Sequence, residues 1–259
     1  MYANYHTHTS LCRHADGDVK QYVENAIKAG IKILGFSDHS PYIFDGDYYS
    51  TYRMHPNETE SYVNEILKLK REYKDDIKIY IGYEMEYYPK YFEKTLKFIL
   101  QFECDYLILG QHFLNDEINE PYVVINTKDK GMLVDYVNQT IEGMKTGVFS
   151  CLAHPDLINY DNDLSLYKFE MSRLCQAAKM LNIPLEINML GLKDNRNYPN
   201  KEFWEIASKT GNDVILGCDA HTPDAFLDDQ AETQGKILAQ EYGIKLIKAL
   251  KLVKPVLKV

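Results

Sequence analysis

Short apolar segments alternate with amphipathic segments along almost the whole chain. Between residues 19 and 27, apolar side chains recur at the spacing of a helix that buries one face. Asp16 or Asp18 can cap the start of this helix, and Gly30 can end it. Residues 31–36 are then mostly apolar, as in a buried strand. This part of the chain therefore predicts a helix followed by a strand.

The same alternation continues to the end of the sequence. Besides an extended segment around His6, the expected strands are residues 31–36, 77–83, 106–109, 148–152, 184–187 and 213–216. The expected helices are residues 19–27, 62–73, 91–102, 131–145, 167–181, 201–210 and 229–252. Neither a repeat nor a linker interrupts this order. The pattern predicts a parallel sheet closed as a (β/α)7 barrel, in a single domain spanning residues 1–259.

Length and charge narrow the class of protein. The 259 residues match the usual size of a single barrel. Lys and Arg number 29 against 38 Asp and Glu, so the net charge is −9, which argues against a general nucleic-acid binder and for a soluble enzyme. We find neither a membrane-spanning apolar run nor a leader before His6. The five cysteines are scattered, and we expect Cys12 to be a free, buried or half-buried thiol in a cytoplasmic protein.

Three of the eight histidines lie within the first fourteen residues. His6 and His8 are two positions apart, so on an extended segment both imidazoles face the same side, and His14 follows closely. Neutral imidazole is a common ligand of zinc, iron and similar ions. Two histidines near a terminus can equally be ordinary surface or core residues, so the interpretation depends on what else the chain supplies.

Six of the seven expected strands end on a candidate metal ligand. These residues are His6 and His8, His39, Glu84 or Glu86, His112, His154, and Asp219 with His221. The C-terminal ends of barrel strands converge on one face, where such folds build their sites. Each residue alone has a plausible structural role, but their shared position predicts a polynuclear metal site.

The ligand types indicate the chemistry of this site. Histidine and carboxylate ligands without thiolates suit zinc, manganese or iron. Paired ions generate hydroxide near neutral pH and stabilise the attacking and leaving oxygens of a phosphoryl group, so hydrolysis is the expected reaction. The sequence contains no Gly-rich phosphate loop or dinucleotide-binding motif that would favour another chemistry.

The order of these motifs resembles the PHP (polymerase and histidinol phosphatase) family. The motifs are His6-Thr7-His8, His14, Ser37-Asp38-His39, Gly82-Tyr83-Glu84, His112, Ala153-His154-Pro155 and Asp219-Ala220-His221. The length, the opening motif and the long loop of residues 40–57 look most like the stand-alone histidinol-phosphate phosphatase branch.

This resemblance implies a distorted (β/α)7 barrel with up to three divalent ions, Zn, Mn or Fe. His6, His8, Glu84 and Asp219 would bind one ion, His14, His39 and His221 a second, and His112 and His154 a third, with Glu84 bridging. Strand parity cannot separate Glu84 from Glu86, and the Gly-x-Glu pattern of the family selects Glu84. Asp38 has the opposite parity to His39, and we expect it to orient a ligand imidazole.

The resemblance further implies phosphomonoester hydrolysis by a metal-bridging hydroxide. L-histidinol phosphate is the expected substrate, and a small phosphorylated metabolite rather than a nucleic acid or a membrane is the expected partner. Asp219, His221 or a bound water would carry the proton to the leaving alcohol, with Glu84 at the centre.

A phosphate group also needs a cationic side chain. Arg13, Arg53 and Arg196 fall in loops on the expected metal face, and we expect at least one of them to bind phosphate. The same long loop carries a tyrosine cluster that could form a lid or pack against the barrel rim. The cluster consists of Tyr42, Phe44, Tyr48, Tyr49 and Tyr52.

Three alternatives remain open from the sequence. The substrate could be another small phosphorylated metabolite or a nucleotide. An amidohydrolase-type hydrolase also begins with His-x-His and ends with an Asp, although this chain offers more ligands than such a site needs. A non-catalytic metal-binding module would be expected to saturate its ions with protein ligands, whereas nine ligands over three ions leave positions open.

Overall fold

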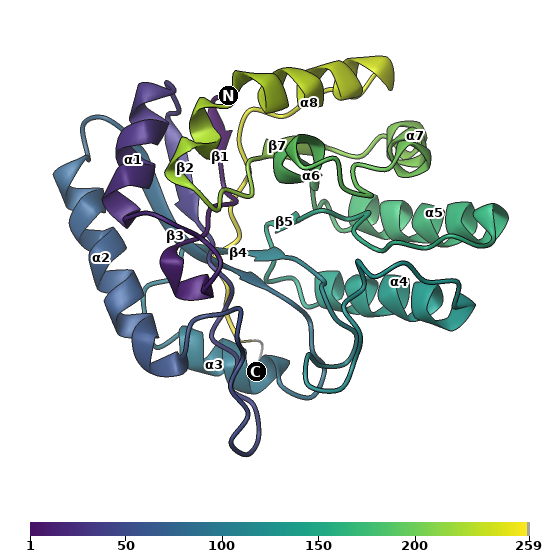
Figure 1. The fold of residues 1–259 in the computed structure, drawn as a ribbon, viewed down its shortest axis with the longest axis horizontal. Coiled ribbons are helices and arrows are strands. Elements are labelled where there is room, and N and C mark those ends of the chain that lie inside the picture. The colour runs from purple at the N-terminus through teal and green to yellow at the C-terminus, as the bar shows by residue number, and fades with distance from the viewer. Residues whose placement is uncertain (258–259) are drawn as a thin grey trace.

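The computed structural model describes residues 1–257, and within them seven parallel strands follow one another in chain order (Figure 1). The strands are β1 Ala3–Asn4, β2 Ile33–Phe36, β3 Lys78–Met85, β4 Tyr106–Leu109, β5 Cys151–Leu152, β6 Leu185–Asn188 and β7 Val214–Gly217. The helices surround this sheet in Figure 1, as right-handed crossovers between parallel strands require. The predicted (β/α)7 barrel is therefore confirmed.

The barrel closes at the ends of its first and last strands. Strand β1 has only two residues, but the chain after it stays extended and Thr7 forms a parallel bridge with Ala220. The backbone N–H of His8 donates to the Ala220 carbonyl at 2.9 Å, and the Ala220 N–H donates to the His6 carbonyl at 3.2 Å. The seam of the barrel thus runs between two segments that carry predicted metal ligands.

Most helices match the amphipathic segments of the sequence. They are α1 Val19–Lys28, α2 Thr59–Glu72, α3 Phe92–Ile99, α4 Lys130–Lys145, α5 Leu164–Met180, α6 Met189–Lys193, α7 Lys201–Thr210 and α8 Asp229–Glu241, with short 3-10 turns at Ser10–Cys12, Pro56–Glu58 and Pro223–Leu227. Helix α1 buries Val19, Tyr22 and Val23 and begins with a capping box between Asp18 and Gln21. Helix α6 was not predicted, because five residues are too short for a periodic signal.

The predicted final helix over residues 229–252 is wrong beyond Glu241. Gly243 adopts a φ of 66°, and the N–H groups of Gly243 and Ile244 bond back to α8 carbonyls, which ends the helix. The chain then extends under the barrel, where Leu246 bridges to Val214 and Leu250 is buried. The apolar residues of this segment form the floor of the barrel, and their spacing resembles that of a helical face.

The inside of the barrel is filled with side chains below the site. The inward-facing residues of this lower core are Ala3, Tyr5, Tyr106, Ile108, Cys151, Ala153, Ile215 and Leu250. The hydroxyl of Tyr106 donates to the backbone carbonyls of Tyr5 at 2.7 Å and of Phe36 at 3.1 Å. The barrel is therefore a packed core and not a pore.

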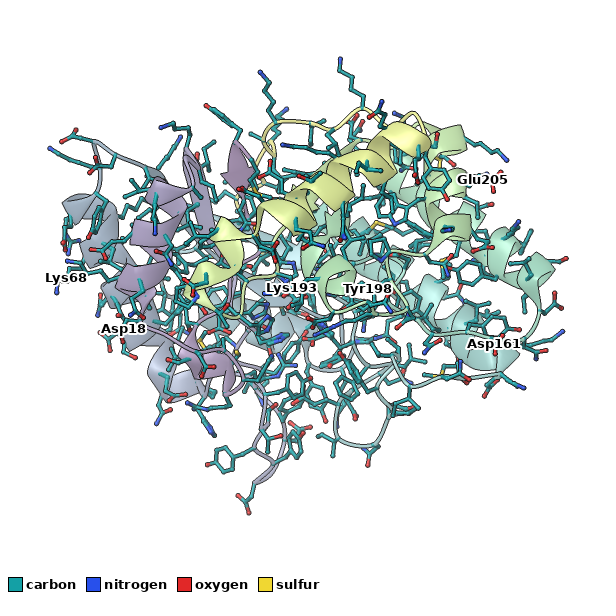
Figure 2. The ribbon with its side chains drawn as sticks, turned by 45° about the horizontal axis from the view of Figure 1, so that its top comes forward. Asp18, Lys68, Asp161, Lys193, Tyr198 and Glu205 are labelled. Carbon is teal, nitrogen blue, oxygen red and sulfur yellow. The ribbon has the colours of Figure 1, made fainter. Side chains whose placement is uncertain are left out.

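Charged side chains extend outward from the helices. Figure 2 shows Lys68 and Asp161 at the periphery, whereas Tyr198 lies over the centre of the molecule. Within the described 257 residues, none of the helices combines the length and the apolar composition needed to cross a bilayer.

Candidate metal centre

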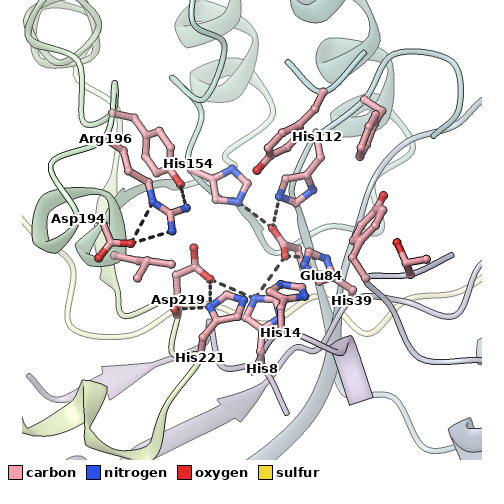
Figure 3. A pocket seen from close by; sticks show the side chains of 16 residues that line it. His8, His14, His39, Glu84, His112, His154, Asp194, Arg196, Asp219 and His221 are labelled. Atoms are coloured by element: carbon pink, nitrogen blue, oxygen red, sulfur yellow. Dashed lines mark hydrogen bonds and ion pairs between the residues drawn. The ribbon is translucent and has the colours of Figure 1, made fainter. Parts of the chain in front are cut away.

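Glu84 lies at the centre of a cluster of imidazoles (Figure 3). One carboxylate oxygen, Oε2, is 3.5 Å from Nε2 of both His6 and His8 and 3.2 Å from Nδ1 of His39. The other, Oε1, is 2.8 Å from Nε2 of His154 and 3.6 Å from Nε2 of His112. The side chain sits near the end of β3, and its two oxygens reach imidazoles that follow β1, β2, β4 and β5.

Asp219 is a second carboxylate between the imidazoles. Its Oδ1 lies 3.3 Å from Nε2 of His6, 3.1 Å from Nε2 of His8 and 3.4 Å from Nδ1 of His221. The residue follows β7 with a φ of 49°, a left-handed backbone that few residues other than Gly, Asn and Asp adopt. His6 and His8 share this contact because alternate residues of the extended segment face one side, as predicted.

His14 completes the cluster from the loop after β1. Its ring centre lies 5.4 Å from that of His39 and 4.8 Å from that of His221. The 3-10 turn Ser10–Cys12 and a left-handed Arg13, with φ of 71°, turn the chain so that His14 faces the site. Ligand atoms of His14, His39 and His221 all lie within 4.8 Å of one another.

Several imidazoles are held through Nδ1. The Nδ1–H of His14 donates to the Cys12 carbonyl at 2.7 Å, that of His221 to the Asp219 carbonyl at 2.9 Å, and that of His112 to Glu86 at 2.9 Å. A bond at Nδ1 fixes the tautomer and leaves Nε2 as the free lone pair.

The donor set fits divalent metal ions. In residues 1–257, several buried ligand nitrogens have no hydrogen-bond partner, which is rare for buried polar atoms. They are His6 Nε2, His8 Nδ1, His8 Nε2, His39 Nδ1, His154 Nδ1 and His221 Nε2. Bound ions would satisfy such atoms, and groups such as His6 with His8 and Asp219 have the compact spacing that an ion needs.

Protonation of the site follows from burial and neighbouring charge. Burial raises the pKa of Glu84 and of Asp219, but the surrounding imidazoles outweigh it and hold both values well below the usual range. Burial lowers the pKa of His6, yet Asp219 and Glu186 raise it well above normal. Burial and then the neighbouring His8 lower the pKa of His221 to about 3. A protonated imidazole such as that of His6 must lose a proton to bind a metal ion. Metal affinity should therefore fall at low pH.

Glu84 and Glu86, which the sequence could not separate, have different surroundings. Glu86 is fully buried, accepts from His112 Nδ1 and pairs with the guanidinium of Arg53 at 3.1 Å. Burial raises the pKa of Glu86, but Arg53 and His112 lower it below its usual value. Glu86 therefore holds the imidazole of His112 through Nδ1, whereas Glu84 faces its Nε2 and the rest of the cluster. Asp38 is placed comparably, with Oδ1 3.5 Å from Nδ1 of His8.

A cavity of about 590 Å³ opens above the cluster. Predicted ligands such as Glu84, His154 and Asp219 line it, and Figure 3 shows Arg196 next to Asp194. The lining also includes the aromatic residues Tyr52, Phe113, Tyr122 and Tyr198. Rings of Tyr52 and Phe113 stack with centres 5.7 Å apart, and Phe113 lies 5.4 Å from Tyr122. The cavity therefore joins a polar floor to an aromatic wall.

Arg13, Arg53 and Arg196, of which at least one was predicted to bind phosphate, differ in burial and in their partners. Arg13 is partly exposed and pairs with Glu58 outside the cavity. Arg53 is buried, and its guanidinium is bonded to Glu86, Glu117 and the Ser40 carbonyl, since a buried charge must be paired. Of these three arginines, Arg196 is the one that lines the cavity in the described chain, and the prediction that at least one of the three binds phosphate is carried forward for Arg196.

The tyrosine cluster of the long loop was expected to form a lid or to pack against the barrel rim, and its members lie in different places. Tyr42 is buried, and its hydroxyl donates to the Glu86 carbonyl, so it packs against the rim. Tyr52 lines the cavity, and its hydroxyl donates to Glu117. Tyr49 is 68% exposed.

Sequence reasoning missed two buried polar residues on β6, Glu186 and Asn188. Glu186 accepts from His6 Nδ1 at 2.9 Å, and Asn188 donates to Asp219 at 3.1 Å. An available signal was a glutamate inside an otherwise apolar strand, because alternation turns it away from Leu185 and Ile187.

Several known proteins resemble this chain in sequence or in fold. A protein of Deinococcus radiodurans named "Probable histidinol-phosphatase" is 27% identical over 227 residues, which are 84% of this chain and 85% of that protein. A Bacillus subtilis histidinol-phosphatase is 33% identical over 119 residues, covering 43% of this chain and 44% of its own. A histidinol phosphate phosphatase of Lactococcus lactis, solved with Zn, L-histidinol and phosphate, superposes with a TM-score of 0.73 at 20% identity, over 95% of each chain.

The family model described as "PHP domain" matches residues 4–190. That range includes seven of the nine predicted ligands, and the fold brings the remaining two, Asp219 and His221, to the same cluster. Because this match covers well over half of its length, the chain belongs to the PHP domain family.

Proposed function

We propose that the protein is a metal-dependent phosphomonoesterase that hydrolyses L-histidinol phosphate to L-histidinol and phosphate. One observation carries this proposal: histidine and carboxylate ligands from six strand ends form the floor of a single cavity whose wall carries Arg196. The names of the relatives and the ligands of the Lactococcus lactis enzyme support the choice of substrate.

The donor set offers places for up to three ions of zinc, manganese or iron. His6, His8, Glu84 and Asp219 would bind one, His14, His39 and His221 a second, and His112 and His154 a third, with Glu84 between them. Such ions, when bound, lower the pKa of water to near neutrality and offset the charge of phosphate oxygens.

The protein's own residues would position the phosphate. The Nη2 of Arg196 lies 2.8 Å from Asp194, and its Nη1 lies 2.9 Å from the Tyr198 hydroxyl, so the guanidinium is held over the cavity. A guanidinium presents paired N–H donors that match phosphate oxygens. We therefore propose Arg196 as the phosphate-binding arginine.

The leaving alcohol would lie against the aromatic wall. Tyr52, Phe113 and Tyr122 present ring surfaces that exclude water and can stack on the imidazole of histidinol. Asp219 and His221 border the cavity, and we propose that one of them or a bound water carries a proton toward the departing oxygen.

The test is elemental analysis of the purified protein, followed by a substrate panel on the same sample. We expect more than one ion per chain, and hydrolysis of histidinol phosphate in preference to p-nitrophenyl phosphate and nucleotide bisphosphates. His154→Ala should reduce turnover at least about 100-fold with the fold intact, since a lost ligand removes an ion that acts in the transition state. Undiminished turnover by metal-stripped protein would contradict the proposal. Preference for another phosphate ester would change only the substrate.

We further propose that residues 1–259 act as one catalytic domain in the cytoplasm. The ligands come from both ends of the chain to one site, and all five cysteines are free and buried among the described residues. Free thiols are typical of a reducing compartment.

A further inference from the structure

Strand β6 provides none of the nine predicted ligands, yet it turns two polar side chains into the barrel. Glu186 is 3% exposed and Asn188 is 1% exposed. In the parallel register, Asn188 pairs with Gly217 of β7. A Cβ atom at Gly217 would lie only 1.7 Å from Oε1 of Glu186, so the glycine leaves the space that this carboxylate occupies.

The carboxylate of Glu186 contacts predicted ligands from two other strands, and a third through Asn188. It accepts from Nδ1 of His6 at 2.9 Å, from the backbone N–H of His154 at 3.1 Å and from Nδ2 of Asn188 at 3.1 Å. The same Asn188 nitrogen is 3.1 Å from Oδ2 of Asp219. The ends of β1, β5 and β7 are thus connected through two side chains of β6.

The bond to His6 determines which of its nitrogens faces the cluster. An ionised carboxylate only accepts, so the hydrogen must reside on Nδ1 of His6. In the neutral imidazole that binds an ion, Nε2 then carries the lone pair, and it lies 3.3 Å from Oδ1 of Asp219 and 3.5 Å from Oε2 of Glu84. A ligand imidazole held in this way is oriented before any ion arrives.

The bond to His154 holds an unusual backbone. His154 has a φ of 28°, outside the regions that residues with a side chain ordinarily adopt. Such a conformation persists only when its surroundings hold it. Its N–H has a charged acceptor in Glu186, and this bond keeps the imidazole directed at Glu84.

We propose that Glu186 is a positioning residue of the metal centre: its carboxylate sets the tautomer of His6 and holds the backbone of His154, and Asn188 extends this support to Asp219. Glu186 is absent from the cavity lining in the described structure, so it acts through the ligands and not on the substrate. The inference rests on the proposed metal-dependent function.

The test compares Glu186→Gln with Glu170→Gln in the full-length protein. Glu170 is 4% exposed, but it pairs with Arg173 on the outer helix α5, so it controls for loss of a buried carboxylate elsewhere. Zinc affinity is measured by competition with a chromophoric chelator, and thermal unfolding of the chelator-treated proteins checks the fold. We expect Glu186→Gln to bind zinc about 10- to 100-fold more weakly than wild type, because an amide cannot accept all three hydrogen bonds. Glu170→Gln should bind zinc as wild type does.

Folded Glu186→Gln protein with zinc affinity within twofold of wild type would overturn the proposal, as would an equal loss in Glu170→Gln. If Glu186→Gln does not fold, Glu186→Asp retains the charge on a shorter side chain, and it too must lose zinc affinity. The measurement is independent of turnover. If wild-type protein binds zinc but hydrolyses no phosphomonoester, the proposed function fails while the role of Glu186 is still decided.

Discussion

Arginine side chains in this protein show how burial decides the role of a single residue. Arg53 is fully buried between the rings of Tyr42 and Tyr52, and its charge is committed to Glu86 and Glu117. Removing one partner of such a buried group is costly, because the other charges stay unpaired. Arg53 therefore links the long loop of residues 40–57 to Glu86, which holds the imidazole of His112. A phosphate would have to displace Glu86 and Glu117 to reach this guanidinium.

We predict that Arg196→Ala raises the KM for histidinol phosphate about 10- to 100-fold with a smaller change in kcat. The physical reason is the loss of charge-assisted hydrogen bonds of about 1.5–3 kcal/mol, and 1.4 kcal/mol corresponds to a factor of ten. Steady-state kinetics on metal-loaded protein measures this effect.

Arg13→Ala is the matched control. Arg13 and Arg196 have equally exposed side chains, 36% each, and each pairs with one carboxylate, but only Arg196 borders the cavity in the described chain. The KM of Arg13→Ala should stay within twofold of wild type. Equal effects of both substitutions would indicate general electrostatic attraction instead of a phosphate contact.

At the level of elements, Asp156 connects the loop after β5 to helix α7. Its carboxylate accepts from the Asn200 backbone N–H and from Nε1–H of Trp204 at 3.1 Å. Burial raises the pKa of Asp156 to about 7 despite these bonds. The folded protein therefore binds a proton between about pH 4 and pH 7 that the unfolded chain has released.

We predict that this group makes wild-type protein less stable as the pH rises from 4 to 7. The unfolded state binds fewer protons in this window, so the free energy of unfolding falls by up to about 1.4 kcal/mol per pH unit. Asp156→Asn removes the titration. Urea unfolding of the chelator-treated proteins at pH 5 and pH 7 measures this effect. Between these two pH values, the free energy of unfolding should fall by roughly 2 kcal/mol more in wild type than in Asp156→Asn. The same pH dependence in both proteins would contradict the assignment.

The segment after α8 forms the floor of the barrel. Leu250 is buried against the lower core, and the N–H of Val253 donates to the Ser150 hydroxyl at 2.9 Å. We predict that Leu250→Ala lowers the free energy of unfolding by about 2–3 kcal/mol, because it removes buried methyl groups and leaves a cavity.

Val253→Ala is the control for Leu250→Ala, since Val253 is 38% exposed and its bond to Ser150 uses the backbone. Its stability should change by less than about 0.5 kcal/mol. Urea unfolding measures both variants. A loss for Leu250→Ala as small as for Val253→Ala would mean that this segment does not support the barrel.

At the scale of the whole molecule, the metal centre joins the two ends of the chain. His6 and His8 lie near the N-terminus and Asp219 near the C-terminus, and the barrel seam runs between them. Ions bound here would cross-link the first and last strands and stabilise only the folded state.

We predict that zinc raises the thermal unfolding midpoint of chelator-treated protein by roughly 5–10 °C. Zinc at 100 times its dissociation constant contributes about 2.7 kcal/mol, and 1 kcal/mol shifts the midpoint of a chain of this size by about 2–4 °C. Magnesium at the same concentration should have a much smaller effect, because it prefers oxygen ligands. An unchanged midpoint with zinc would argue against metal binding by the folded protein.

Local patterns along the chain were enough to predict the alternation of strands and helices and the residues at the strand ends. Both are local: periodicity reports which face of an element is buried, and parallel barrel strands all end on the same side. Those two facts sufficed to predict the barrel and to bring His6, His39, His112 and His154 to one place as candidate ligands.

The tertiary structure alone decided which neighbours each polar side chain meets. Glu84 and Glu86 have the same parity, and contacts between distant residues give them different surroundings, such as the ion pair of Glu86 with Arg53, 33 residues away. The bond of Glu186 to His6 spans 180 residues, and no local pattern reports it. The course of the chain after Gly243 was likewise settled by the barrel floor, because apolar spacing cannot tell a helix face from a segment that packs under a sheet.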